Sequence, residues 1–309
     1  MKPATTPANP DGFFWRWHTY FSERFPPLQH GLLIAAFCFG VLSYAARVAM
    51  PAQKPGAMVF VVAFVTAFLM ILQLRILDEF KDFEEDARWR PYRPVPRGLI
   101  SLASLRRLWF MAAAVQVGVA LLLDARLLAG LLAVWLYSGL MGVEFFIRDW
   151  LKAHPLVYML SHILIVPMIA TYVAACHWLP QGMKMPDLAG LLAASYFAFC
   201  VIEVGRKIRA PVDEEEGVET YTALWGAHRA LAAWLGFMIT GSAFAVLAAL
   251  RIQSATFVAT LLGAVLLFAM LGAVAFLRSS GQGGGTRFNR LSGLWTLILF
   301  LGLGLGSFY

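Results

Sequence analysis

The chain contains 309 residues, of which 60% are hydrophobic and only 14% are charged, and its mean hydropathy is +0.69. A soluble domain carries about 25% charged residues, so this composition excludes a soluble single-domain protein. The apolar residues occur in blocks of about 20, the length that crosses a bilayer as a helix, which excludes a disordered or fibrous chain. In a membrane protein the net charge of +7 marks cytoplasmic loops and contacts with lipid headgroups, so we expect membrane lipids and no nucleic acid as partners.

Nine apolar segments of the sequence are predicted to cross the membrane as helices, which makes the fold class all-α. In chain order they cover residues 28–48, 56–77, 105–123, 127–146, 155–176, 187–204, 230–250, 255–277 and 291–308. We expect residues 1–309 to form a single transmembrane domain of a polytopic membrane protein. The aromatic segment 1–27 precedes the first span and is predicted to lie at the cytoplasmic surface of the membrane.

Lysine and arginine are distributed unequally between the two sides that the nine spans define. With the N-terminus in the cytoplasm, 20 of the 25 basic residues fall on the cytoplasmic side, which predicts this orientation. The charged loops 78–104 and 203–229 then share the cytoplasmic side, and the expected location is the inner membrane of a bacterium. These loops hold 12 of the 18 carboxylates, which are costly near a membrane edge unless they are paired or bound to metal.

The first charged loop opens with an acidic cluster. Asp78, Asp82 and Asp86 recur every four residues, so on a continuous helix they would share one face and repel each other. Such a face needs either arginine partners or a divalent cation with oxygen ligands. Mg²⁺ fits best, because it takes few carboxylates and completes its shell with water and phosphate oxygens.

A stretch rich in arginine and proline follows the acidic cluster directly. Prolines at 91, 94 and 96 forbid a helix there and keep the chain extended. Arginines such as Arg90 and Arg93 can hold a phosphate group with two parallel hydrogen bonds. Carboxylates for a metal beside arginines for phosphate are what a diphosphate substrate needs. The alternative is a solvated loop in which the acids and arginines pair with each other.

These residues carry a resemblance to a known family. The string Asp78-Glu79-x-x-Asp82-x-x-x-Asp86, followed by Arg93-Pro94-x-Pro96-x-Gly98, resembles the first signature of the UbiA-type intramembrane prenyltransferases, N-D-x-x-D-x-x-x-D followed by R-P-x-x-x-G. The resemblance covers essentially the whole chain and implies nine transmembrane helices around a central cavity, with cytoplasmic cap loops whose two acidic motifs bind Mg²⁺ and a prenyl diphosphate. It implies four metal ligands in the first motif, Asp78, Glu79, Asp82 and Asp86, of which Asp82 and Asp86 are expected to be catalytic.

The second acidic motif of that family is expected after span six. Gly217-Val-x-Thr220 resembles the family's G-I-x-T/S, which aligns Asp213 with the last acid of the motif and Glu203 near the first, as metal ligands. The acids between them are missing, and basic residues occupy or flank their places. We therefore expect basic side chains to neutralise part of the diphosphate on this side, namely Arg206, Lys207 and Arg209.

Three further polar features lie between spans four and five or inside span five. Lys152 matches by position a lysine that contacts diphosphate in the family, and we expect it to bind diphosphate and to act in catalysis. Glu144 and Arg148 are spaced as an ion pair on a helix, which could be purely structural. His162 either lines an acceptor pocket or packs as a hydrogen-bonded core histidine, which is the commoner role.

The sequence therefore predicts a Mg²⁺-dependent prenyltransferase that moves an isoprenoid group from a prenyl diphosphate to an aromatic or other lipophilic acceptor and releases diphosphate. The same site would also suit a terpene cyclase or a phosphoribosyltransferase. A divalent-metal transporter is an alternative of another class. It would need ionisable residues at mid-membrane depth, where His162 and little else qualifies.

Overall fold

The computed structural model describes residues 12–49, 52–278 and 285–308, and within these ranges the ordered elements are all helical. Eight helical segments are long and apolar enough to cross a membrane: α2 (Pro27–Val48), α3 (Ala57–Lys81), α5 (Leu102–Leu123), the pair α8 and α9 (Pro155–Trp178), α10 (Ala189–Arg206), α12 (Ala227–Arg251), α13 (Ala255–Arg278) and α14 (Gly285–Gly306). A shorter apolar helix of 16 residues, α6 (Leu127–Gly142), supplies the remaining predicted span. The all-α, polytopic membrane fold is confirmed.

Proline accounts for the break inside the fifth predicted span. The fifth span consists of α8 (Pro155–Ile163) and α9 (Ile165–Trp178), which meet at Leu164. Pro167 has no amide hydrogen and its ring would clash with the carbonyl of Ile163, so the hydrogen-bond ladder is interrupted one turn before it. Pro155 itself occupies the first turn of α8, where a missing amide hydrogen costs nothing.

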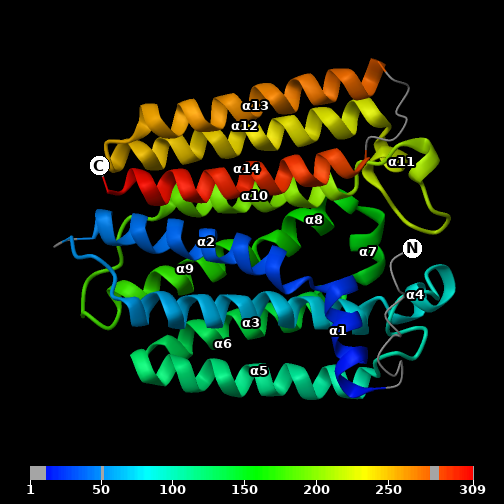
Figure 1. Ribbon diagram of the computed structural model, residues 1–309, viewed down its shortest axis with the longest axis horizontal. Coiled ribbons are helices and arrows are strands. Elements are labelled where there is room, and N and C mark those ends of the chain that lie inside the picture. The colour runs from blue at the N-terminus through cyan, green and yellow to red at the C-terminus, as the bar shows by residue number, and fades with distance from the viewer. Residues whose placement is uncertain (1–11, 50–51, 279–284, 309) are drawn as a thin grey trace, which may run out of the picture.

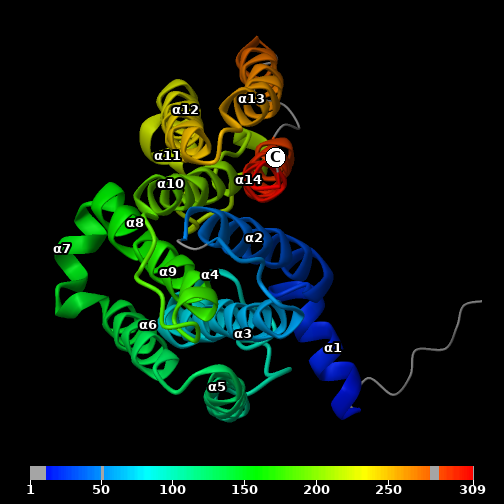
Figure 2. The ribbon, with the colours of Figure 1, turned by 90° about the vertical axis from the view of Figure 1, so that its left-hand side faces the viewer.

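The helices form two groups that pack side by side. The first group contains α2, α3, α5, α6 and α9, and the second contains α10, α12, α13 and α14 (Figure 2). Helices α2 and α14 join the groups through glycine, because a Cβ on Gly40 would lie 2.5 Å from the carbonyl oxygen of Phe300, and one on Gly304 would overlap the ring of Phe39. Small residues of this kind let membrane helices approach closely.

Four short helices gather at one end of the bundle: α1 (Phe13–Arg24), α4 (Phe83–Trp89), α7 (Arg148–Ala153) and α11 (Tyr221–Trp225) (Figure 1). Both charged loops therefore lie at the same end. Helix α1 exposes Phe13 and Phe14 and buries Tyr20, the amphipathic pattern of an interfacial helix. It docks on the first charged loop, where Arg16 Nε donates to the Leu99 carbonyl at 2.6 Å. Residues 1–11 of the predicted interfacial segment lie outside the described residues.

Candidate active site

A polar pocket of about 650 Å³ opens at the end of the bundle that carries the short helices. Its walls come from α3, α4, α7, α8 and α10 and from both charged loops. Eight of the predicted site residues line it: Asp78, Asp82, Arg90, Arg93, Lys152, Arg206, Lys207 and Arg209. The other four, Glu79, Asp86, Glu203 and Asp213, are not among the lining residues.

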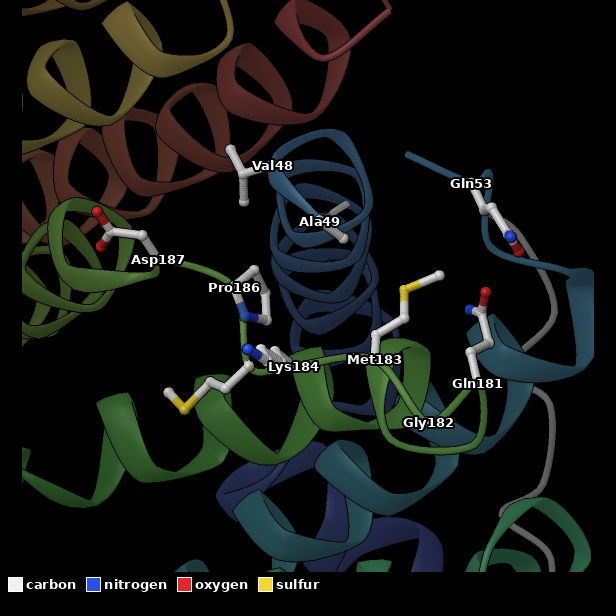
Figure 3. A pocket seen from close by; sticks show the side chains of 10 residues that line it. Val48, Ala49, Gln53, Gln181, Gly182, Met183, Lys184, Pro186 and Asp187 are labelled. Atoms are coloured by element: carbon white, nitrogen blue, oxygen red, sulfur yellow. The ribbon is translucent and has the colours of Figure 1, made fainter. Parts of the chain in front are cut away.

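A second pocket, of about 840 Å³, lies at the opposite end of the bundle, between the end of α2 and the segment 181–187 (Figure 3). Its charged lining residues are Lys184 and Asp187, and Asp187 pairs with Arg251 at 2.8 Å. Although it is larger, this pocket brings together none of the predicted site residues. We therefore take the polar pocket at the charged end as the candidate active site.

The acidic wall of the polar pocket consists of Asp78 and Asp82. Asp78 is half-exposed and makes only long ion pairs, at 3.6 Å to Arg75 and 3.8 Å to Lys81. Asp82 lies at the junction of α3 and α4, and its carboxylate has no hydrogen bond or ion pair within the described parts of the chain. Burial raises the pKa of the Asp82 carboxyl, and it outweighs the opposing charge of Lys81.

This donor set fits Mg²⁺ that arrives with a phosphate. In residues 12–49, 52–278 and 285–308, no cluster of three or more histidine, cysteine, aspartate or glutamate side chains is placed to hold a metal by itself. Mg²⁺ does not need such a cluster, because it is commonly held by one or two carboxylates together with substrate phosphates. Asp78 and Asp82 supply two carboxylates without strong protein partners, in a pocket that also contains phosphate-binding side chains.

The other two acids of the first motif, Glu79 and Asp86, form ion pairs with arginines. Glu79 is 2% exposed and pairs with Arg24 of α1 at 2.5 Å and with Arg75 at 3.3 Å. Asp86 is 1% exposed and pairs with Arg90 at 2.7 Å and Arg93 at 2.6 Å. The four-residue spacing of Asp78, Asp82 and Asp86 would align their carboxylates only on a continuous helix, and the helix is interrupted at Asp82. The arginine partners considered from the sequence are therefore present for Glu79 and Asp86.

The basic side chains of the pocket wall form ion pairs with two carboxylates, of which Glu85 also lines the pocket and Glu203 does not. Glu203 pairs with Arg206 at 2.6 Å and with Lys207 at 3.1 Å. On α7, Lys152 forms a close ion pair with Glu85, and this hydrogen bond lowers the pKa of Glu85. These pairs orient the cations at the pocket wall without enclosing them.

Asp213 and its neighbours complete this side of the site. Asp213 is exposed, ends a short 3-10 turn and is not among the pocket-lining residues. Arg209 donates to the backbone carbonyl of Asp213 at 3.1 Å and to the Glu215 carboxylate at 2.9 Å.

The two charged loops meet beside the pocket. The Tyr92 hydroxyl donates to Glu215 at 2.7 Å, and this hydrogen bond, together with that from Arg209, holds the pKa of Glu215 below its usual range. Gly217 has a φ of +72° and lies so close to Trp89 that a Cβ would overlap the indole ring. Both its conformation and its contact therefore require glycine.

This contact predicts that Gly217→Ala separates the two loops. The added methyl group forces Trp89 out of its place, and we expect the loop to become more accessible to trypsin at the bond between Arg88 and Trp89. Gly182→Ala is the matched control, because Gly182 has a similar φ of +65° but nothing within 4 Å of its Cβ position. Equal tryptic cleavage rates for the two variants would show that the Trp89 contact does not hold the loops together.

Several pocket residues escaped the sequence-based prediction. Arg75 lines the pocket from within α3, and an arginine inside a predicted span was a usable signal.

No ion pair joins Glu144 to Arg148 in the described structure, because residues 144–146 form a left-handed turn instead of a helix. His162 stacks on Tyr158 with ring centroids 4.1 Å apart and is not among the pocket-lining residues, which agrees with a packing role.

The arrangement resembles known structures. A UbiA homologue from Aeropyrum pernix K1, in the apo state, matches with a TM-score of 0.64 and 14% identity over 87% of this chain and 96% of that chain. A structure of digeranylgeranylglyceryl phosphate synthase matches with a TM-score of 0.54 and 13% identity over 94% of this chain and 98% of that chain. At these identities the matches establish the fold. No curated protein sequence matches this chain.

Sequence comparison with family models settles the assignment. The model of the UbiA prenyltransferase family matches residues 32–298, which include the predicted spans from α2 to α14 and both charged loops. This chain is therefore an integral membrane enzyme that belongs to the UbiA prenyltransferase family.

Proposed function

We propose that this enzyme transfers an isoprenoid group from a prenyl diphosphate to a lipophilic acceptor and releases diphosphate. The observation that carries the proposal is the polar pocket, in which Asp78 and Asp82 share one cavity with Lys152, Arg206, Lys207 and Arg209. Two carboxylates without strong partners and a wall of cations are what a diphosphate and its metal require. Membership of the family supports the same chemistry.

In this proposal Asp78 and Asp82 hold Mg²⁺. The bound ion supplies positive charge close to the leaving diphosphate. Glu79, Asp86, Glu203 and Asp213, the other metal ligands expected from the sequence, do not line the pocket, and their role at a metal stays a prediction.

The basic side chains stabilise the leaving group as the bond between the isoprenoid carbon and the diphosphate oxygen breaks. Arg90, Arg93, Lys152, Arg206, Lys207 and Arg209 all line the pocket and carry charges that complement the developing negative charge. Lys152 is already oriented by Glu85, and Arg206 by Glu203. Fixed cations need little reorganisation when the charge appears, which is the basis of electrostatic catalysis.

The position of the pocket suits an amphiphilic substrate. It lies at the ends of α3, α8 and α10, so the diphosphate stays at the charged end while the isoprenoid tail reaches apolar helix faces. We propose that this end faces the cytoplasm of a bacterium, with the protein in the inner membrane. The excess of lysine and arginine in the loops at this end supports that orientation.

Product analysis tests the proposal directly. The full chain, purified in detergent, is incubated with farnesyl or geranylgeranyl diphosphate, Mg²⁺ and a membrane lipid extract as the source of acceptor. We expect diphosphate release and a prenylated product detected by mass spectrometry, and we expect EDTA to stop both until Mg²⁺ is restored. No diphosphate release with either substrate, together with divalent-metal flux in liposomes, would overturn the proposal in favour of a transporter.

A further inference from the structure

Glu144 is a buried carboxylate in the wall of the polar pocket. It is 4% exposed, and its Oε2 atom has no hydrogen-bond partner. Among the residues that the structure describes, no ion pair involves Glu144. Buried carboxylates are normally paired or hydrogen-bonded, because losing water without gaining a donor is unfavourable. Glu144 therefore lines the pocket, while its Oε2 atom, which is closed to solvent, has no donor among the described residues.

The backbone holds Glu144 in this position at a cost. Glu144, Phe145 and Phe146 have φ values of 52°, 53° and 61°, three successive residues in the left-handed region that glycine normally occupies. Such strain persists only where surrounding contacts fix it, and it is concentrated at functional sites. Here the ring of Phe145 packs edge-on against Tyr137 and His162, each with centroids 5.6 Å away.

Neighbouring cations do not neutralise Glu144. Lys152, in the same pocket, pairs with Glu85, and Lys81 donates to the hydroxyl of Tyr158. Arg148 lines the pocket but makes no ion pair with Glu144 in the described parts of the chain. Within the described residues no side chain supplies a donor to Glu144, so a molecule bound in the pocket can supply one.

The charge of Glu144 restricts what that molecule is. A carboxylate repels a diphosphate, so this part of the wall does not suit the leaving group. Glu144 also does not join Asp78 and Asp82 in a three-residue metal cluster within the described structure. The remaining candidate partner for Glu144 is the second substrate, which would contact it through a neutral group that carries a hydrogen-bond donor.

We infer that Glu144 binds the acceptor by accepting a hydrogen bond from its O–H or N–H group. The acceptor class is then an alcohol, a phenol or an amine, and an acceptor that presents a carboxylate at this point is disfavoured by like charge. The inference rests on the proposed function, because an acceptor is needed only if the isoprenoid group is transferred to another molecule.

The test uses three probe molecules. Two of them, 4-nonylphenol and 4-nonylaniline, carry a hydrogen-bond donor, and the third, the methyl ether of 4-nonylphenol, has none. Their Kd values are measured by titration in detergent, with the full chain already saturated with farnesyl thiolodiphosphate, which is not readily cleaved. The wild type is expected to bind at least one donor probe about tenfold or more tightly than the ether, as for hydrogen bonds to charged groups. Glu144→Ala is expected to lose this preference, and Glu144→Gln to retain part of it through the amide oxygen.

The controls separate this inference from the proposed function and from misfolding. All variants should bind farnesyl thiolodiphosphate at least as tightly as the wild type, which reports a folded diphosphate site. Glu216→Gln removes an exposed carboxylate outside the pocket lining and should leave the donor preference intact. Equal binding of donor and ether probes by the wild type, or a preference that survives in Glu144→Ala, would overturn the inference. Failure of the wild type to bind farnesyl thiolodiphosphate would instead contradict the proposed function.

Discussion

Asp82→Ala is expected to lower Mg²⁺-dependent diphosphate release by about 100-fold or more, the scale of loss when one electrostatic contact to a reacting group is removed. Asp82 lines the pocket, and its carboxylate has no protein partner within the described residues. Its removal should therefore leave the thermal midpoint of unfolding close to the wild-type value, because no ion pair is broken. Released diphosphate and the thermal midpoint are measured on the same detergent preparation.

Asp149→Asn is the matched control for this experiment. Asp149 is an exposed aspartate in α7 at the same end of the bundle, but it is not among the pocket-lining residues. We expect this variant to release diphosphate at the wild-type rate. The assignment of Asp82 to the site fails if Asp82→Ala retains more than about a tenth of the wild-type rate, a loss much smaller than a direct contact predicts.

Asp86→Ala is expected to act first on stability. The Asp86 carboxylate is buried between Arg90 at 2.7 Å, Arg93 at 2.6 Å and Arg24 at 3.9 Å, so its loss leaves the largely buried Arg90 and Arg93 without this counter-charge. Breaking a buried ion pair by removing one partner typically costs about 3–5 kcal/mol of unfolding free energy. Denaturation of the full chain in mixed micelles, followed by circular dichroism, measures this loss.

The comparison variant for Asp86→Ala is Glu85→Gln, at the residue that precedes Asp86 in α4. Glu85 is half-exposed in its ion pair with Lys152, and an exposed pair contributes about 0–1 kcal/mol. We therefore expect a much smaller change in unfolding free energy than for Asp86→Ala. If Asp86→Ala abolished diphosphate release while its unfolding free energy stayed at the wild-type value, Asp86 would belong to the metal site rather than to the scaffold.

Hydropathy was sufficient to predict the membrane-spanning architecture. The apolar blocks correspond to α2, α3, α5, α6, α8 with α9, α10, α12, α13 and α14, because a bilayer imposes one length on every span. The concentration of charge likewise identified the two loops that border the polar pocket. The position of Asp82 in the pocket follows from this charge cluster, whereas Lys152 and Arg206, which also line the pocket, were predicted from the resemblance to the family.

The direction of individual carboxylates could not be predicted from spacing. Glu79 turns to Arg24, a residue 55 positions earlier in the chain, and no local pattern reveals such a partner. The interruption at Asp82 has no proline or glycine to mark it. The left-handed turn at Glu144 also lacks the glycine or asparagine that usually signals such a turn. Here the tertiary packing of Phe145 overrides the local backbone preference.

The glycine contacts of α14 join helices that are synthesised at different times. Gly40 of α2 and Gly304 of α14 bring the first described span against the last, and Gly205 brings α10 against Ser292 of α14. During synthesis α2 and α10 enter the membrane before α14 exists, so their glycine faces remain against lipid until the final helix arrives. The walls of the polar pocket come from α3, α8 and α10, on both sides of this seam. The contacts across this seam that involve α14 therefore form only after α14 has been translated.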